Sequence, residues 1–576
     1  MVLVTNRHPT ADDPYGLNLS GPEEGQIPFL NPYRNVRELS EAEMVKLRRH
    51  PFEVAQGIIE TYSVEGIDAL NAVPGEVERL KWVGLYPQRQ GGDAFMMRIK
   101  VPGGLLSADQ AREIGMIAEG YAHGPVDHPR FGNRYVDITT RQALQVHWLT
   151  MASIPKIWQR FAAVGLTSIQ ACGDCARNVT ACPTSGADPD EQVDTIGVAR
   201  AISDFFTGNR YYANLPRKFK LAVCGCGKDC TRVEINDVAL WAAERDGIHG
   251  FNLLVGGGLS DGERMAQDID VFVEEHEAVE ISRAVAQLFG ELGNREHRGL
   301  ARMRYLVQEL GPERFRAELA ARTTLELKTA GTERTTSYRR DIVGVHPERL
   351  PGFVTVGCNI PVGRLTGAEL VEFARIASTY GDGTLRLGVD QNLALTGVGA
   401  GHLEALLAEP LLEKFSPTPT NIERSVAACT GSEFCRYAIV ETKERALRLA
   451  DEIDRKVTAA LGGPPPADAP LRIHLSGCSA SCGQPQIADI GLRGAVNKDG
   501  ATLEEGYDIG LGGVLGPEAS FADWIAGAVP ARSLSDALSA VIVAWAEGRR
   551  PGEGFTPWVR RTPLATLRHL IGEEAS

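Results

Sequence analysis

Apolar positions along the chain predict strands and helices that follow one another. The segment 95–102, FMMRIKVP, has the composition and spacing of a strand. Ser107 then stands where it would cap a helix of about a dozen residues. Nearer the N-terminus, SEAE from Ser40 has the form of a capping box that opens another helix. WVGLYP from Trp82 predicts the start of a strand followed by a turn.

The same pattern occurs twice in the chain. VPGGLLSADQ from Val101 resembles IPVGRLTGAE from Ile360, at an offset of 361 − 102 = 259 residues. The match resumes at a shorter offset, 391 − 142 = 249, where Gln142 faces Gln391. A period this long excludes a solenoid and indicates a duplication.

Cysteine-bearing segments take part in the repeat. GCGKDC at 225–230 faces GCSASC at 477–482, and AC at 171–172 faces AC at 428–429. Matches in one order over two halves predict a pseudo-twofold fold of mixed α+β and α/β class. Each half is expected to hold a small ferredoxin-like βαβ module and then a larger α/β module. The predicted segments are an N-terminal extended arm and helix at 1–75, ferredoxin-like half-domains at 76–165 and 341–415, and α/β modules at 166–340 and 416–576.

Composition narrows the class of protein. The chain has 576 residues, 43% hydrophobic and 23% charged, so several domains are expected. The net charge of −14 argues against nucleic acid as a partner. The apolar stretch 538–546 is too short to cross a membrane, and the N-terminus lacks an apolar secretory core, so a cytoplasmic monomer is expected. Eleven cysteines in such a chain favour reduced thiols and metal ligands over disulfides.

Four of these cysteines form two close pairs near the C-terminal end. Cys429 and Cys435 stand six apart, and Cys478 and Cys482 stand four apart. Two such pairs can supply four thiolates to one inorganic centre, and both zinc and a [4Fe–4S] cluster accept four. The spacing alone leaves a cluster, a zinc ion and reduced buried thiols open.

The residues around the pairs resemble one family. ACTGSEFCRYAIVETK at 428–443 and HLSGCSASCGQPQ at 474–486 closely resemble the cluster segment of the nitrite and sulfite reductases. TTRQALQ at 139–145, RNV at 177–179 and NLPRKFK at 214–220 extend the resemblance, which runs from about residue 80 to residue 560. It implies a siroheme coupled to a [4Fe–4S] cluster. By resemblance, the cluster ligands are Cys429, Cys435, Cys478 and Cys482, and Cys482 is also the proximal ligand of the siroheme iron.

The resemblance also implies the residues on the substrate side. A small anion beside a carboxylate-rich macrocycle needs fixed cations. Lys218 and Lys220 alternate in an apolar stretch, so strand geometry would place both on one face. By resemblance, the substrate cations are Arg98, Arg177, Lys218 and Lys220, and Arg141 and Gln142 contact the siroheme rim.

The choice of substrate rests on two further features. KFK at 218–220 resembles the sulfite-reducing version of the motif, since nitrite-reducing members tend to carry Asn at the position of Lys220. Cys172 resembles a position that is crosslinked to a tyrosine in a sulfite-reducing branch, and the matching tyrosine is Tyr86. The expected activity is therefore six-electron reduction of sulfite to sulfide. The alternatives are a nitrite reductase that makes ammonia and a non-catalytic metal-binding or siroheme-binding protein.

Further cysteines stand where the repeat places the cluster ligands. These are Cys172 with Cys175 and Cys226 with Cys230. A second cluster or a zinc ion there is one interpretation. A relic of duplication is favoured, because the same segments carry the substrate cations and a cluster would compete with them for space.

Electrons must come from another protein. The sequence has no dinucleotide fingerprint and no flavin module, and the resemblance implies ferredoxin as the donor. Basic residues near the C-terminus predict a docking surface for such an acidic partner. They are Arg549, Arg550, Arg560, Arg561 and Arg568.

Overall fold

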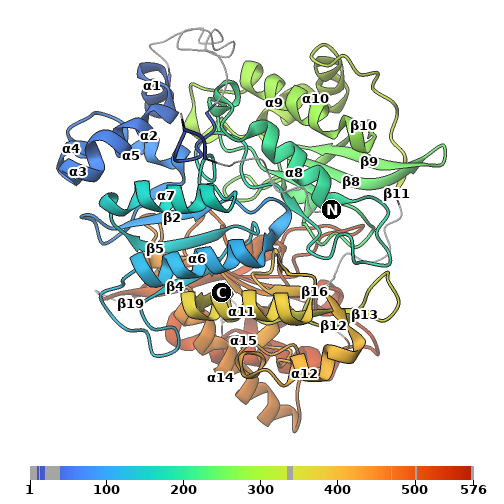
Figure 1. Cartoon of the computed structure of the whole chain (residues 1–576). Coiled ribbons are helices and arrows are strands. Elements are labelled where there is room, and N and C mark those ends of the chain that lie inside the picture. Colours follow the sequence, from blue (N-terminus) through green and yellow to red (C-terminus); the bar gives the residue numbers. More distant parts are fainter. Residues whose placement is uncertain are drawn as a thin grey trace.

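The computed structural model describes residues 9–11, 13–19, 39–333, 341–466, 468, 470–499 and 502–572. Four β-sheets organise this part of the chain (Figure 1). Two small sheets form the ferredoxin-like half-domains and two larger ones form the α/β modules. The extended arm predicted around residues 31–33 lies outside the described residues.

The two half-domain sheets exchange one strand each. The first sheet has the order β1 (Leu85–Pro87), β2 (Phe95–Ile99), β5 (Leu144–Leu149), β4 (Tyr135–Ile138) and β14 (Arg364–Thr366). The second has the order β12 (Gly344–Pro347), β13 (Phe353–Cys358), β16 (Leu393–Gly399), β15 (Thr384–Leu387) and β3 (Leu105–Ser107). Strand β14 of the second half thus completes the first sheet, and β3 of the first half completes the second. The halves therefore cannot separate without breaking both sheets.

Two helices confirm the repeat at the level of their caps. Helix α6 (Ala108–Tyr121) begins with a capping box between Ser107 and Gln110, and α11 (Gly367–Tyr380) begins with one between Thr366 and Glu369. The two helices lie side by side in the middle of Figure 1. They approach so closely that a Cβ atom on Gly115 would lie 2.5 Å from the carbonyl oxygen of Gly367. The predicted helix after Ser107 is confirmed.

The two larger sheets repeat one topology. The first contains β6 (Thr180–Ala181), β7 (Leu221–Cys224), β8 (Val238–Arg245), β9 (Ile248–Val255) and β10 (Gln267–Val273), with β11 (Thr332–Glu333) paired to β8. The second contains β17 (Val426–Ala428), β18 (Ile473–Ser476), β19 (Ile490–Asp499), β20 (Thr502–Leu511) and β21 (Asp523–Pro530). In each sheet the first three strands are parallel and the rest are antiparallel. The pseudo-twofold, internally duplicated architecture is as predicted.

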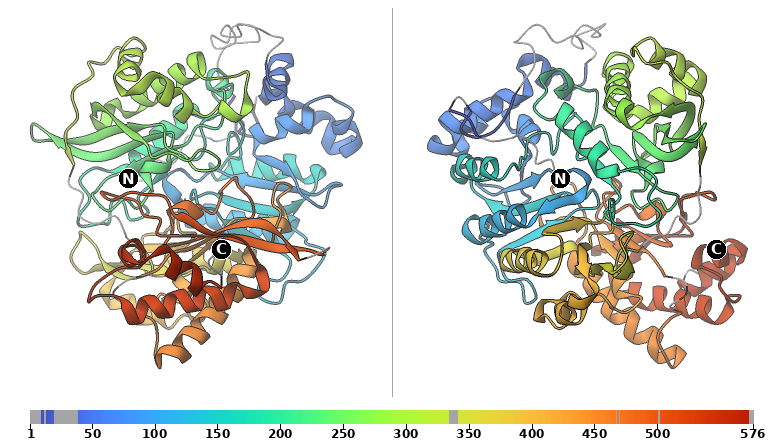
Figure 2. Two further views of the ribbon diagram at one scale, coloured as in Figure 1. Left: turned by 180° about the vertical axis from the view of Figure 1, so that it is seen from behind. Right: turned by 45° about the vertical axis from the view of Figure 1, so that its right-hand side comes forward.

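Helices cover these sheets and complete two separate cores. The first module carries α8 (Thr195–Phe206), α9 (Ala278–Leu292) and α10 (Met303–Ala320), and the second carries α14 (Lys443–Leu461), α15 (Leu534–Gly548), α16 (Phe555–Arg561) and α17 (Leu564–Leu570). In both views of Figure 2 the second module, orange to red, lies below the first, drawn in green. A third core is shared by the two half-domains, with contributions from residue 52 to residue 415.

The parallel strands correct the sequence alignment of the repeat. Ala181 pairs with Val223 on β7 as Ala428 pairs with Leu475 on β18. The counterpart of the cluster cysteine at 429 is therefore residue 182, and the match of 171–172 with 428–429 was wrong. The first half contains two AC pairs, at 171–172 and 181–182, ten residues apart. The sequence alone does not distinguish them, and the strand register does.

Smaller helices pack on the first half-domain. They are α1 (Glu41–Arg48), α2 (Val54–Gly57), α3 (Ser63–Glu65), α4 (Ile67–Asn71), α5 (Glu76–Arg79) and α7 (Ile154–Ala163), while α12 (Leu403–Leu407) and α13 (Pro410–Lys414) follow the second half-domain. Ser40 precedes α1 as predicted, but its side chain makes no capping hydrogen bond, so the predicted box is wrong. Trp82 lies in a 3-10 turn, and the strand begins at Leu85.

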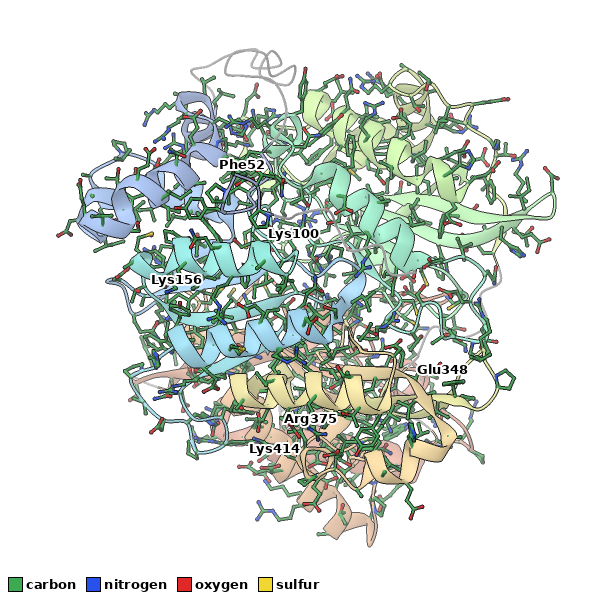
Figure 3. The ribbon with its side chains drawn as sticks, in the orientation of Figure 1. Phe52, Lys100, Lys156, Glu348, Arg375 and Lys414 are labelled. Carbon is green, nitrogen blue, oxygen red and sulfur yellow. The ribbon has the colours of Figure 1, made fainter. Side chains whose placement is uncertain are left out.

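One labelled side chain shows how the half-domain meets the first module. Lys100, in Figure 3, follows β2 and donates a hydrogen bond from its Nζ to the Oγ1 of Thr207, at 2.8 Å. Both side chains are buried. Across the described ranges, the helices are all too short or too polar to cross a membrane.

Candidate cofactor and anion site

The first cysteines of the two pairs lie at the carboxyl ends of neighbouring parallel strands. Cys429 follows β17 and Cys478 follows β18. The backbone N–H of Cys429 donates to the carbonyl of Leu475 at 3.1 Å, and the N–H of Gly477 donates to the Cys429 sulfur at 3.2 Å. Carboxyl ends of adjacent parallel strands meet at one edge, so this topology brings segments 50 residues apart together.

All four cysteines of the quartet face one space. Cys429, Cys435 and Cys478 are part-buried, and Cys482 is exposed. Burial raises the pKa of the first three thiols, to about 12 for Cys429, and the charge of Cys482 raises each of them further. A thiolate that influences three other thiols lies near them all, so the structure assembles the predicted quartet.

The number and kind of ligands in the quartet match those of a [4Fe–4S] cluster, which takes four thiolates. A [4Fe–4S] cluster takes one thiolate at each iron, so its ligands surround a volume, whereas zinc draws four onto one ion. Because burial opposes thiolate formation at Cys429, the bound metal must supply the energy of deprotonation.

The loop between β4 and β5 lies between this quartet and the basic residues predicted on the substrate side. The hydroxyl of Thr140 donates to the carbonyl of Cys482 at 2.9 Å. The next residue, Arg141, donates to the Oδ1 of Asn236 at 2.7 Å and to the carbonyl of Asn178 at 2.6 Å. Its buried Nε has no partner. Burial, with several neighbouring guanidinium groups, lowers the pKa of Arg141 to about 9. An anionic group beside it would relieve both deficits.

Gln142 has a different role from the one predicted. Its side chain is fully buried, and its Nε2 donates to the carbonyls of Ala181 and Leu387, both at 2.8 Å. Its Oε1 accepts from the N–H of Ala181 at 3.0 Å. The counterpart, Gln391, holds Ile138 and Ala428 in the same way. The hydrogen bonds of the Gln142 amide thus join the two halves of the chain. Gln142 therefore has a structural role, in place of the predicted contact with the siroheme rim.

The two lysines share one face, as their alternation predicted. They precede β7, and Phe219 between them makes an isolated bridge to Ala176 and is fully buried. In the part of the chain that the structure describes, neither ammonium has a hydrogen bond or an ion pair. Burial, then each other's charge and that of Arg302, lowers the pKa of Lys218 well below its usual range. Burial and Arg141 lower that of Lys220 to about 7. Both lack the anion that their charges require.

Arg98 and Arg177 lie close to the predicted crosslink pair, Tyr86 and Cys172. Arg98, on β2, donates to the sulfur of Cys172 at 3.2 Å, and its guanidinium lies 5.9 Å from the ring centre of Tyr86. Arg177 donates to the carbonyl of Gly173 at 2.8 Å. The Tyr86 hydroxyl is in hydrogen-bond contact with the Cys172 thiol, and burial with this contact raises the pKa of the tyrosine. The structure therefore brings Tyr86 and Cys172 together beside the cations.

Two functional residues escaped the sequence analysis. Arg302 forms an ion pair with Asp237 at 2.9 Å, and the N–H of Lys220 donates to the other oxygen of Asp237 at 2.9 Å. Arg302 adds to the positive charge around both lysines. The only signal for Asp237 was its place in the repeat, where IND at 235–237 faces IAD at 487–489. Arg302 had none.

The predicted basic docking surface is not supported. Arg549 pairs with Asp468, Arg560 with Glu518 at 3.1 Å, and Arg561 with Glu553 at 2.7 Å. These ion pairs cancel most of the charge that the sequence suggested.

Family models match most of the chain. The "Nitrite/Sulfite reductase ferredoxin-like half domain" matches residues 86–164 and 346–412, and the "Nitrite and sulphite reductase 4Fe-4S domain" matches 172–327 and 421–576.

Three relatives place the chain more closely. It is 40% identical to the assimilatory ferredoxin-dependent nitrite reductase of Haloferax mediterranei, over 87% of this chain and 88% of that one. It is 39% identical to the ferredoxin–nitrite reductase of Synechococcus elongatus, over 88% and 96%. The solved structure of the Mycobacterium tuberculosis NirA protein matches with a TM-score of 0.85 at 31% identity, covering 92% of this chain and 98% of that one.

These relatives overturn one prediction. The relatives from Haloferax mediterranei and Synechococcus elongatus are named nitrite reductases, so the assignment as a sulfite reductase was wrong. The predicted cofactors stand, a siroheme and a [4Fe–4S] cluster. With two duplicated half-domains and two 4Fe–4S-type modules, the chain belongs to the nitrite and sulfite reductase family.

Proposed function

We propose that this protein is a ferredoxin-dependent nitrite reductase that converts nitrite to ammonia in a six-electron reaction. One observation carries the proposal: the half-buried ammonium groups of Lys218 and Lys220, which form no ion pair among the described residues, lie within electrostatic reach of the exposed thiol of Cys482. The names of the relatives support nitrite as the anion.

The cysteine quartet would hold the cluster, and Cys482 would also bind the siroheme iron. When bound, the two cofactors supply one-electron transfer to a substrate on the iron. Arg141 fits the rim of a macrocycle that carries carboxylates, because its Nε is buried and without a partner.

The predicted substrate cations would bind and orient nitrite. They are Arg98, Arg177, Lys218 and Lys220. Guanidinium groups hold fixed, planar hydrogen-bond geometry toward nitrite oxygens, whereas an ammonium can also give up a proton. Lys220, with a pKa of about 7, is the residue best matched to proton transfer at neutral pH. Asp237 would keep Lys220 in place through the backbone hydrogen bond and balance part of the local charge.

The electron donor would be ferredoxin. The relatives are named for it, and the sequence contains no dinucleotide fingerprint. The remaining arginines at the C-terminus do not define where it binds.

Two measurements test the function. Purified protein should absorb visible light as a siroheme protein and contain iron and acid-labile sulfide in the ratio expected for one cluster and one macrocycle. At equal supply of reduced ferredoxin, nitrite should be turned over faster than sulfite. A colourless protein, or faster reduction of sulfite, would contradict the proposal.

A crosslink between Tyr86 and Cys172 is a separate proposal. Its support is the hydrogen-bond contact between the two side chains. A proteolytic pair of peptides that contains both residues should be linked and two hydrogens lighter than the sum of its parts. Tyr86→Phe is the control and should release the Cys172 peptide unmodified. Two separate, unmodified peptides from the wild type would end the idea.

A further inference from the structure

Two segments of the first α/β module carry most of the predicted substrate cations, and these segments are paired with each other. They are residues 172–177 and residues 214–220. The N–H of Phe219 donates to the carbonyl of Cys175 at 3.0 Å, and the N–H of Arg177 donates to the carbonyl of Phe219 at 2.8 Å. The positions of the basic side chains on both segments therefore depend on how the segments are held together.

Asp174 lies in the first of these segments, and its carboxylate binds two basic side chains. Arg298 donates to both carboxylate oxygens, at 2.7 and 2.9 Å. The ammonium of Lys46, on α1, lies 3.5 Å from one of the same oxygens. Burial opposes the charge of this carboxylate, but Lys46 and Arg298 outweigh burial and hold the pKa of Asp174 below its usual range. The side chain is therefore ionised at neutral pH.

The same basic residues also hold the second segment. Three successive backbone carbonyls of that segment each accept a hydrogen bond from a different basic side chain. The donors, each with the carbonyl that it binds, are Arg295 with Asn214 at 2.9 Å, Lys46 with Leu215 at 2.8 Å and Arg298 with Pro216 at 3.0 Å. Lys46 and Arg298 thus each bridge the carboxylate of Asp174 and a carbonyl of the neighbouring segment. Glu43, on α1, completes the group by forming ion pairs with Lys46 and with Arg295, the latter at 2.9 Å.

We call Glu43, Lys46, Asp174, Arg295 and Arg298 the ionic clamp. Four of these side chains are at most 4% exposed, and that of Arg298 is 34% exposed. A buried ion pair adds little net stability, because both charges lose their water, and its better-attested effect is to select one arrangement of the groups that it joins. In this protein the clamp selects the arrangement of the two segments that carry the substrate cations.

The second module joins the matching segments with a neutral side chain. The strand register sets an offset of 247 residues before β6 and of 252 residues before β7, so Asp174 corresponds to Asn421 and Asn214 corresponds to Pro466. The Nδ2 of Asn421 donates to the carbonyl of Pro466 at 2.9 Å. An amide thus makes this connection in the module whose Arg424 is paired with a carboxylate. A charged clamp makes it in the module whose substrate lysines have no ion pair among the described residues.

We propose that Asp174 is a positioning residue for the anionic substrate, and that the ionic clamp built on it fixes Arg177 and Lys218 relative to each other. The inference rests on the proposed function, in which these two side chains bind nitrite. Asp174 acts through the backbone, because Arg177 follows it by three residues and Lys218 follows the last clamped carbonyl by two. A displacement of about 1 Å within a catalytic site can lower the rate about 100-fold, so the clamp matters although it does not touch the substrate.

Asp174→Asn in the holoenzyme tests the proposal, because the amide keeps the size of the side chain and removes its charge. We expect kcat/KM for nitrite to fall by about 10- to 100-fold, mainly through a higher KM. The iron content and the visible spectrum should remain those of the wild type. Binding of carbon monoxide to the reduced protein should also be unchanged, because a neutral ligand needs no cation. Asn421→Ala, the matched control in the second module, should leave the nitrite kinetics unchanged.

Amide hydrogen exchange measures the clamp without any substrate. Peptides that cover residues 214–220 should exchange faster in Asp174→Asn than in the wild type, whereas peptides that cover residues 470–476 should not. Arg298→Gln provides a second variant should Asp174→Asn fail to fold. Its side chain is partly exposed, and its loss removes the bridge between Asp174 and the second segment.

The wild-type rates distinguish a failure of this inference from a failure of the proposed function. Faster reduction of sulfite than of nitrite by the wild type would contradict the function, and the clamp would then be judged from the KM for sulfite, which is also an anion. Equal losses of nitrite and carbon monoxide binding in Asp174→Asn would overturn the positioning role. Unchanged kinetics and unchanged hydrogen exchange in Arg298→Gln and Asp174→Asn would overturn it as well.

Discussion

The two α/β modules share one strand topology, but they differ in how their basic residues are paired with carboxylates. In the first, Arg177, Lys218 and Lys220 stand near the amino ends of the parallel strands, and none of the three has an ion pair among the described residues. In the second, the counterparts of Arg177 and Lys220 are Arg424 and Arg472, at offsets of 247 and 252 residues. Arg424 is paired with Asp341, and the place of Arg141 is taken by Asp390. These four second-half residues line one pocket.

The difference teaches that charge balance, not fold, decides which copy can take an anion. Arg232 and Arg472 lower the pKa of Asp390, so that pocket contains its own carboxylates. In the first-half site, the carboxylate beside Lys220 is that of Asp237, which also forms an ion pair with Arg302.

The largest effect is expected at the last cysteine of each loop. Cys482→Ala should remove cluster and siroheme together and abolish nitrite reduction, because this residue would bind both. Cys230→Ser, at the matching position, should retain iron, acid-labile sulfide and the visible spectrum. Metal analysis and absorption spectra measure this. Equal loss of iron from both variants would show that both modules are needed to bind the cofactors.

The next effect is expected at the lysine that faces the substrate. Lys220→Gln should lower kcat/KM for nitrite by about 10²- to 10⁴-fold, the usual cost of losing a positioned proton donor. Arg424→Gln, on the paired side, should change it by less than about threefold, since an exposed or half-exposed ion pair contributes little. Steady-state kinetics with reduced ferredoxin distinguishes these outcomes. A larger loss at Arg424 would break the comparison.

A pH dependence should accompany this lysine. Arg141 and Arg302 lower the pKa of Lys220, and Asp237 and Cys482 oppose them, with burial the largest cause. Below pH 7 the ammonium is charged and attracts nitrite, and above pH 7 it loses its proton. We therefore expect kcat/KM to fall as the pH rises through about 7. Lys220→Arg should flatten this limb because a guanidinium stays charged. An unchanged profile in that variant would assign the titration elsewhere.

The smallest effect, and the most symmetrical, is expected at the two buried glutamines. Gln142→Ala and Gln391→Ala each leave buried backbone groups without their hydrogen-bond partner. Each such group costs about 1–3 kcal/mol of the free energy of unfolding. Both should lower the unfolding temperature by similar amounts and leave the visible spectrum unchanged. Differential scanning calorimetry tests this. Loss of siroheme in Gln142→Ala alone would restore the role predicted for it from the sequence.

Much of the site could be predicted from local spacing. The capping box at Ser107 and the repeat of Val101 at Ile360 lie within short segments, where side-chain period and cap chemistry act between near neighbours. The lysine pair at 218 and 220 was placed on one face for the same reason. Gln142 was misjudged because its partner, the carbonyl of Leu387, comes from the other half of the chain.

The sequence by itself determined the family, the duplication and the four sulfurs, because loops that carry such ligands keep their spacing wherever they fold. Only the tertiary structure decided which alanine–cysteine pair matches the cluster loop, that Arg302 joins the cations, and that Arg549, Arg560 and Arg561 form ion pairs with carboxylates. These outcomes depend on strand register and on charges summed through space over residues far apart in the chain. A linear pattern does not contain those distances.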